Sequence, residues 1–313
     1  MLKTALIGYG YWGSKLARNF NNLKAFELVS IIDLSTKNLA SAKKNYPLAK
    51  LFTNYKKALT NSSIDLVIIA TPTSTHYKIS KFALEKFKHV LVEKPLSLNL
   101  SDVKKLNTIA NKNKKMIFVD YPFLFSGTIN FLKKIINKNK YGKIVEIESF
   151  REQAPIRKDV NVIWDLCTHD VSILTYLLKT KPYSIKTIKK KSIKGPHCDT
   201  AYINLKYPNN LNVLIKNAWI SPTKIRLIKI KFERAIVFCD ENESLYKIKV
   251  YKQSFKKLNN YNLEIPEIDL SEPLSKLAAY IHRSIQTKNN KLFKNQFNEK
   301  ITYLLEKINK SND

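Results

Sequence analysis

The sequence predicts an α/β chain, with an N-terminal Rossmann (doubly wound parallel) sheet and a C-terminal α+β domain built on a mostly antiparallel open sheet. Three observations predict it. Three of the six glycines in the 313 residues fall within six positions, between an apolar run and a helical pattern. Apolar, β-branched runs then alternate with helical patterns through residue 119, and beyond residue 120 strand-like stretches dominate. We therefore expect two domains, residues 1–120 and 121–313.

The elements follow in order along the chain. In the first domain we expect strands near 2–8, 27–33, 64–70, 88–93 and 115–119, and helices near 12–22, 36–45, 75–87 and 100–113. In the second we expect helices near 126–139 and from Trp164, strands near 143–151, 184–193, 200–207, 211–218, 225–232 and 235–239, and amphipathic helices at 273–287 and 294–310. Strands that alternate with helices indicate parallel pairing. An open sheet has one face left over after helices cover the other, so we expect a homodimer or homotetramer.

The glycine cluster consists of Gly8, Gly10 and Gly13, in the segment Gly8-Tyr-Gly-Tyr-Trp-Gly13. A strand, a tight turn and a helix in this order place backbone N–H groups and a helix N-terminus against a pyrophosphate. A glycine turn without a ligand is the alternative, so the context decides. The next apolar strand ends in Asp33, about twenty residues on, where a Rossmann unit carries an acid for the adenosine ribose hydroxyls. We therefore predict a dinucleotide coenzyme.

The type of coenzyme depends on Asp33. A carboxylate repels a 2′-phosphate, so this residue favours NAD over NADP. The polar side chains that follow it, at residues 35–37, could partly accommodate a 2′-phosphate, so NADP remains the alternative coenzyme. NAD is the expected coenzyme.

Composition excludes several classes of protein. Lys and Arg number 55 against 25 Asp and Glu, a net charge of +30, but the lysines are spread over nearly every predicted element without a recognition motif. Dispersed charge supports only non-specific attraction of anions, so we expect no specific nucleic-acid binding. Cys167, Cys198 and Cys239 are far apart, which predicts neither disulfides nor a metal site. With no membrane-length apolar run and no signal-peptide pattern, we expect a cytoplasmic protein that does not bind membranes.

Two strand ends carry candidate coenzyme-binding residues. Glu93-Lys94-Pro95 follows an apolar strand, and the carboxyl ends of parallel strands lie beside the ligand crevice. We expect Lys94 where the nicotinamide reacts, with a cis Lys94–Pro95 bond as one way to aim it. A solvated strand-end lysine is the alternative. Thr71 and Pro72, with His76 beyond them, end another strand and suit the coenzyme, although His76 also fits an exposed first turn.

The second domain offers a carboxylate and an imidazole four residues apart. Asp165 and His169 open a predicted helix and project from one face of it. A neighbouring carboxylate raises the basicity of an imidazole and fixes its tautomer. Oxidation of a secondary alcohol needs a base for the hydroxyl proton, and a histidine suits that role. An ordinary helix ion pair is the competing interpretation.

These motifs together resemble the Gfo/Idh/MocA family, the glucose–fructose oxidoreductase and inositol dehydrogenase group. The resemblance covers essentially the whole chain. It implies a sugar oxidoreductase in which Lys94 and His169 flank the reacting carbon and Asp165 assists. We expect a coenzyme site formed by the glycine segment with Tyr11 and Trp12, by Asp33, and by Thr71, Pro72, His76, Glu93 and Lys94, and we expect no metal.

One stretch departs from the family pattern. Residues 157–164 stand where many members carry a Gly-rich stretch, and this version resembles a branch associated with surface-polysaccharide and nucleotide-sugar metabolism. A nucleotide-linked sugar is therefore the expected substrate. The alternatives are a free polyol or sugar, as for inositol dehydrogenases, and a non-catalytic NAD-binding regulator.

The candidate substrate-binding residues are polar or aromatic side chains of the second domain. Arg151 and Arg157 suit a diphosphate through their paired N–H donors. Asn161 suits sugar hydroxyls, Trp164 a sugar face, and Tyr121 a supplementary proton donor. A purely structural role is the alternative for these side chains.

Overall fold

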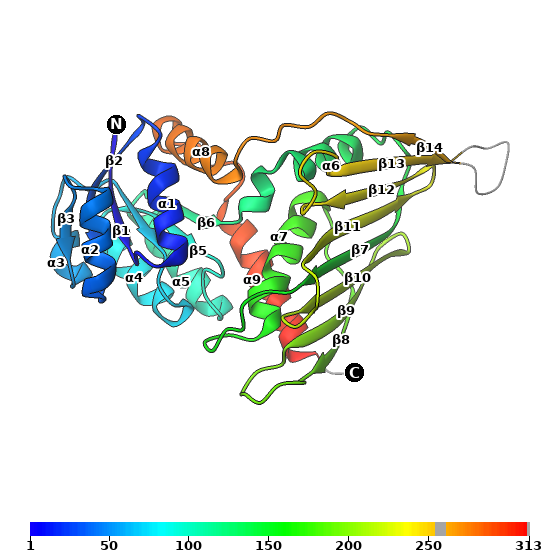
Figure 1. The fold of residues 1–313 in the computed structure, drawn as a ribbon, viewed down its shortest axis with the longest axis horizontal. Coiled ribbons are helices and arrows are strands. Elements are labelled where there is room, and N and C mark those ends of the chain that lie inside the picture. The colour runs from blue at the N-terminus through cyan, green and yellow to red at the C-terminus, as the bar shows by residue number, and fades with distance from the viewer. Residues whose placement is uncertain (254–260, 312–313) are drawn as a thin grey trace. The chain divides into compact units, whose positions relative to one another are not determined.

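The computed structural model describes residues 1–253 and 261–311 (Figure 1). Its contacts separate two compact units. Unit 1 comprises Met1–Pro122 and Glu272–Thr302, and unit 2 comprises Phe123–Ser271 and Tyr303–Asp313. The first boundary falls two residues from the predicted one, but the simple division into 1–120 and 121–313 needs a correction. Residues 272–302 return to unit 1, where α8 (Pro273–Thr287) packs against α1 (Tyr11–Asn21).

Unit 1 contains a six-stranded sheet in the order β3-β2-β1-β4-β5-β6, with parallel pairing throughout. This is the strand order of a dinucleotide-binding Rossmann sheet and confirms the predicted class. The strands are β1 (Leu2–Ile7), β2 (Phe26–Ile32), β3 (Lys50–Phe52), β4 (Leu66–Ile69), β5 (His89–Glu93) and β6 (Ile117–Asp120). The other helices are α2 (Thr36–Asn45), α3 (Tyr55–Leu59), α4 (Thr73–Glu85) and α5 (Leu100–Lys112). The short β3 and α3 were not predicted.

The central strands of unit 1 are apolar without alternation because helices cover both faces. β4 reads Leu-Val-Ile-Ile and is buried at every position. On α1 the buried side chains include Leu16 and Phe20, one turn apart, which places the polar face of that helix in solvent.

Unit 2 contains an eight-stranded sheet in the order β14-β13-β12-β11-β7-β10-β9-β8. Neighbours pair antiparallel except β7 and β10, so the sheet is mostly antiparallel, as predicted. Its strands are β7 (Ile144–Glu152), β8 (Ser184–Lys190), β9 (Thr200–Tyr207), β10 (Leu211–Ala218), β11 (Ile225–Phe232), β12 (Ala235–Asp240), β13 (Ile248–Gln253) and β14 (Tyr261–Glu264). The last two strands were not predicted.

The helical part of unit 2 begins with a 3-10 turn, Pro122–Phe125, and α6 (Gly127–Asn137). A π-helical turn, Ile163–Cys167, leads into α7 (Thr168–Leu177). α9 (Asn295–Lys310) starts in unit 1 and ends in unit 2. Helices α6 and α7 lie against one face of the sheet (Figure 1).

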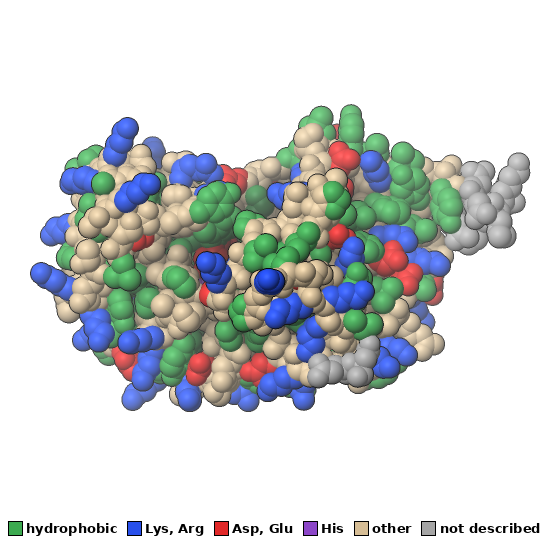
Figure 2. Space-filling view, turned by 60° about the horizontal axis from the view of Figure 1, so that its bottom comes forward, with side chains coloured by type: hydrophobic (Ala, Val, Ile, Leu, Met, Phe, Trp, Pro, Cys, Tyr) green, Lys and Arg blue, Asp and Glu red, His purple; other side chains and the backbone are tan. Residues whose placement is uncertain are grey.

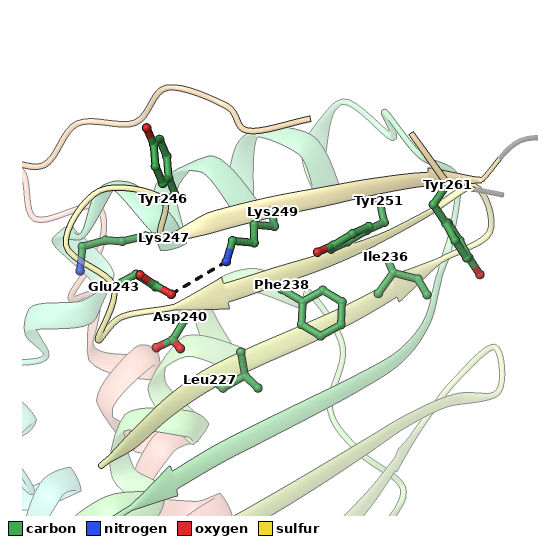
Figure 3. Close-up of a pocket in the computed structure, with 10 residues that line it drawn as sticks. All are labelled: Leu227, Ile236, Phe238, Asp240, Glu243, Tyr246, Lys247, Lys249, Tyr251 and Tyr261. Carbon is green, nitrogen blue, oxygen red and sulfur yellow. Dashed lines mark ion pairs between the residues drawn. The ribbon is translucent and has the colours of Figure 1, made fainter. Parts of the chain in front are cut away.

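The opposite face of the sheet is open. On β9 the residues Ala201, Ile203 and Leu205 are buried, whereas Tyr202, which points the other way, is 39% exposed. On the same open face, the side chains of Ile236, Phe238 and Tyr251 line a hollow across β11, β12 and β13 (Figure 3). The open face is therefore partly apolar and aromatic.

On the face that Figure 2 shows, the basic side chains do not form one patch. Figure 2 shows Lys and Arg scattered over the face in view, between apolar and neutral groups. In the described residues, no helix combines the length and the apolar character that a membrane crossing requires.

Candidate functional site

The glycine turn lies at the carboxyl end of β1, and its three glycines serve different purposes. Gly8 has φ +91°, and a Cβ there would lie 2.5 Å from the carbonyl oxygen of Ala70. A Cβ on Gly13 would lie 1.9 Å from the carbonyl oxygen of Gly8. A Cβ on Gly10 would meet no heavy atom within 4 Å. The fold requires the first and the third glycine, whereas Gly10 leaves open space at the start of α1, and a helix N-terminus is the kind of place that suits an anion.

Asp33 holds this turn in place. Its Oδ2 accepts hydrogen bonds from the backbone N–H of Tyr9, at 2.7 Å, and from the side chain of Asn38, at 3.1 Å. Its Oδ1 accepts from the backbone N–H of Ser35 at 2.8 Å. A carboxylate offers about four acceptor positions, so a ribose hydroxyl still has a place on Oδ1.

The ends of β4 and β5 are joined through His76. One ring nitrogen lies 2.8 Å from the carbonyl oxygen of Thr71, and the other lies 2.8 Å from that of Pro95. The ring is 1% exposed, so the alternative of an exposed first-turn histidine is wrong. His76 therefore connects the loop after β4 with the loop after β5. The Lys94–Pro95 bond is cis, and Lys94 is half-buried.

Sequence reasoning missed a carboxyl pair at the same edge. Glu93 and Asp120 are register partners on β5 and β6, and Asp120 is fully buried. The Trp12 indole N–H donates to Asp120 Oδ2 at 2.7 Å. Burial raises the pKa of both acids, that of Asp120 to about 6. The acid that ends the apolar run Ile117-Phe-Val-Asp120 was the available signal.

In unit 2, Asp165 lies in the π-helical turn and His169 in the first turn of α7. The Trp219 indole N–H donates to Asp165 Oδ2 at 3.0 Å, and Arg157 Nη1 lies 3.6 Å from its Oδ1. The His169 ring is half-buried and makes an edge contact with Phe123, with centroids 5.0 Å apart. Thus Trp219 binds Asp165 and Phe123 contacts His169, and neither contact was predicted from the sequence.

Most of the predicted substrate-binding residues are buried or make contacts that stabilise the fold. Arg151 is 2% exposed, and its Nε donates to the buried Asp170 at 2.8 Å, so binding a diphosphate would require this ion pair to break. Asn161 Oδ1 accepts hydrogen bonds from the backbone N–H groups of residues 163 and 164 and thereby caps the helical turn. Trp164 is 6% exposed, which leaves little of its ring for a sugar.

Tyr121 and Arg157 complete the predicted set. Tyr121 is 1% exposed and stacks on Phe293, which does not suit the proton donor expected in a cleft. Burial also raises its pKa. Arg157 keeps partial exposure, although its guanidinium already donates to both carboxylate oxygens of Asp159. Arg157 and Asn161 are the half-buried members of the set, whereas the other three are buried.

The described residues hold no group of three or more His, Cys, Asp or Glu side chains placed to bind one ion. Cys167, Cys198 and Cys239 are free.

Comparisons with known proteins also identify an NAD-binding Rossmann fold in the first part of the chain. Residues 2–121 match the family model described as "Oxidoreductase family, NAD-binding Rossmann fold". An uncharacterized oxidoreductase, YrbE, of Bacillus subtilis is 22% identical over 69% of this chain and 66% of its own length. Myo-inositol 2-dehydrogenase of Thermotoga maritima is 24% identical over 69% of this chain and 68% of its own length. The chain thus spans about two thirds of these curated relatives.

A solved structure shares the fold over nearly the whole chain. UDP-N-acetylglucosamine 3-dehydrogenase of Acidithiobacillus ferrooxidans superposes with a TM-score of 0.86. The similarity covers 98% of this chain and 96% of that one, at 17% sequence identity. This similarity therefore shows that the two proteins have the same fold.

Proposed function

We propose that this chain transfers hydride between nicotinamide and a sugar carbon that carries a secondary alcohol or ketone, because residues 2–121 match the model of a family of NAD-binding oxidoreductases. The observation that carries the proposal is the open space at Gly10. It lies at the carboxyl edge of a Rossmann sheet, and β1, β4 and β5 are neighbours there. The same edge carries Thr71 after β4 and Lys94 after β5.

The proposed reaction divides its tasks among three side chains. Bound NAD supplies the hydride acceptor or donor. In the oxidative direction His169 takes the hydroxyl proton as the hydride leaves the same carbon, and in the reductive direction it returns that proton. Lys94 donates a hydrogen bond to the reacting oxygen, and Asp165 orients the groups around it. The fixed position of Asp165, between Trp219 and Arg157, supports an orienting role.

Lys94 and His169 are tested together by replacing each side chain. Lys94→Met and His169→Asn should lower turnover by about two to four orders of magnitude and leave NADH binding largely intact. Lys50→Met and His197→Asn, which change an exposed lysine of unit 1 and a histidine of unit 2, are the matched controls. Near-normal turnover in both test variants would contradict the assignment. A non-catalytic NAD-binding regulator would bind NADH without any sugar-dependent hydride transfer.

We propose NAD as the preferred coenzyme. The support is Asp33, whose carboxylate is fixed beside the turn and keeps an acceptor position on Oδ1. Placing a 2′-phosphate against this carboxylate adds charge repulsion. The Michaelis constant for NAD should be well below that for NADP, and a preference for NADP would contradict the role of Asp33.

We further propose a nucleotide-linked sugar as the substrate. The partly exposed guanidinium of Arg157 and the net charge of +30 both favour an anionic ligand. Calorimetric titration with UDP and dTDP separates this class from a free polyol, the alternative that the name of the Thermotoga maritima relative suggests. Binding that weakens in Arg157→Met supports the nucleotide-linked substrate, and no binding favours the polyol.

The open sheet face supports a homodimer or homotetramer. Ile188 and Tyr202 are 48% and 39% exposed there, and further apolar side chains line the hollow in Figure 3. Apolar surface of this kind is characteristic of contacts between subunits. Tyr202→Glu should shift the mass measured by light scattering toward the monomer. An unchanged mass would remove this face from the interface.

A further inference from the structure

Two carboxyl groups meet at the carboxyl edge of the unit 1 sheet. Glu93 ends β5 and Asp120 ends β6, and the two are direct partners in the parallel register. Asp120 is fully buried, and Glu93, although partly exposed as a residue, has a buried Oε1. Two acids this close in a desolvated position are not expected to be ionised together, since their charges repel.

A shared proton explains the pair. Among the described residues, Glu93 Oε1 and Asp120 Oδ1 have no hydrogen-bond donor. A proton held between the two carboxyls supplies the missing donor and removes one negative charge. The positive charge of Lys94 opposes the rise in pKa of both acids and favours the remaining negative charge on the pair.

The remaining oxygen of Asp120 connects the pair to the glycine turn. Asp120 Oδ2 accepts the Trp12 indole N–H at 2.7 Å, a contact between residues 108 positions apart in the chain. Trp12 is the second residue of α1, between Gly10 and Gly13. The bond therefore fixes the first turn of the helix whose N-terminus faces the open space at Gly10.

We propose that Asp120 is a positioning residue for the coenzyme: it shares a proton with Glu93 and, through Trp12, holds the start of α1 in the geometry that binds the pyrophosphate. The proposal rests on the coenzyme part of the proposed function and is independent of the substrate. Binding depends on the backbone N–H groups of this turn, so a small displacement of α1 weakens several hydrogen bonds together.

The test compares variants by direct NADH binding, measured by the fluorescence of the nicotinamide. Asp120→Leu and Trp12→Phe each remove the indole bond, and each should weaken NADH binding by about tenfold, the value of one hydrogen bond to a charged group. The double variant should bind about as well as either single variant, because both remove the same bond. Asp120→Asn keeps an acceptor for the Trp12 indole and gives Glu93 a hydrogen-bond donor, so this variant should bind NADH about as tightly as the wild type does.

The pH profile gives an independent measurement. As the pH rises and the shared proton leaves, NADH binding should weaken in the wild type and stay level in Asp120→Asn. The other titratable groups near the contact are Lys94, beside both acids, Lys15, whose Nζ lies 5.1 Å from the Trp12 ring, and Tyr121, next to Asp120. All of them are present in both proteins, so the difference between the two profiles reports the acid pair.

The control is Tyr176→Phe, which removes a side-chain hydrogen bond to Asn130 in unit 2 and should leave NADH binding unchanged. Melting temperatures without ligand show that each variant is folded, and Trp12→Phe carries the test if Asp120→Leu does not fold. Wild-type affinity in Trp12→Phe, or losses that multiply in the double variant, would overturn the proposal. Absence of NADH binding to the wild type would overturn the proposed function as well.

Discussion

Replacing Gly10 and Gly13 separately with alanine distinguishes a turn built for a ligand from one built only for packing. Gly10 has φ −81°, which alanine adopts readily, and its added Cβ would meet no atom of the protein within 4 Å. The added Cβ of Gly13→Ala would lie 1.9 Å from the Gly8 carbonyl oxygen. The first variant should therefore fold normally and bind coenzyme poorly, whereas the second should lose stability without any ligand.

The sizes of the two effects follow from the local geometry. Gly10 is the N-cap of α1, where alanine is less favourable than glycine by about 0.5–1 kcal/mol. In a unit of this size that loss lowers the melting temperature by about 2–4 °C at most. Gly13→Ala gains about 1 kcal/mol in helix propensity. Relieving its overlap with Gly8 requires a backbone shift of more than 1 Å, at a cost of about 1–3 kcal/mol or more.

The assay is thermal unfolding with and without NADH. A ligand at about one hundred times its dissociation constant stabilises the folded state by about 2.7 kcal/mol, which raises the melting temperature by about 5–10 °C. Gly10→Ala should lose most of this rise while its melting temperature without NADH stays near the wild-type value. A full wild-type rise in Gly10→Ala would refute the reasoning, since the methyl group would then occupy space that the coenzyme does not need.

Two further predictions concern stability. Burial lowers the pKa of His89 to about 4, and its Nδ1 accepts the Met116 backbone N–H, so the folded state holds this ring neutral. The unfolded chain takes up the proton near pH 6.5, so stability is lost as the pH falls toward 4, by about 2 kcal/mol at pH 5; urea unfolding should show a smaller acid loss in His89→Asn, and equal losses would contradict the assignment. Arg151→Met leaves Asp170 buried without its cation and should cost about 3–5 kcal/mol in urea unfolding. Arg157→Met removes a partly exposed ion pair with Asp159 and a longer one, 3.6 Å, with Asp165, so it should cost less, about 1 kcal/mol, and equal costs for the two arginines would refute the argument.

The sequence predicted most elements because their signals are local. Parallel strands buried on both faces read as apolar runs, and the glycine turn is a short motif with a backbone cause. The missed elements lack such signals. β3 has three residues, and β14 (Tyr261–Glu264) is mostly exposed, so neither shows a clear apolar pattern. The return of residues 272–302 to unit 1 depends on which surface an amphipathic helix covers, and an amphipathic pattern does not say which surface that is.

The site residues show the same division between local and distant causes. The bond between Trp12 and Asp120 joins positions 108 residues apart, and no spacing rule links them. Asn161 was expected to bind sugar hydroxyls, yet its carbonyl oxygen caps a helical turn. A polar residue just before a helix suits either role, and only the neighbouring N–H groups decide between them.

The candidate residues of unit 1 and those of unit 2 therefore differ in how much a sequence reveals about them. The coenzyme recognition proposed for unit 1 uses backbone groups of the glycine turn, where the fold itself requires Gly8 and Gly13 but not Gly10. In unit 2 the expected ligand-binding side chains also suit the fold: Arg151 neutralises Asp170 and places its guanidinium 4.3 Å from the Phe123 ring, which in turn contacts His169. Arg151 thus reaches the proposed acid–base residue through packing rather than through the substrate. It follows that a variant of Arg151 should alter the folding of unit 2 before it alters the choice of substrate.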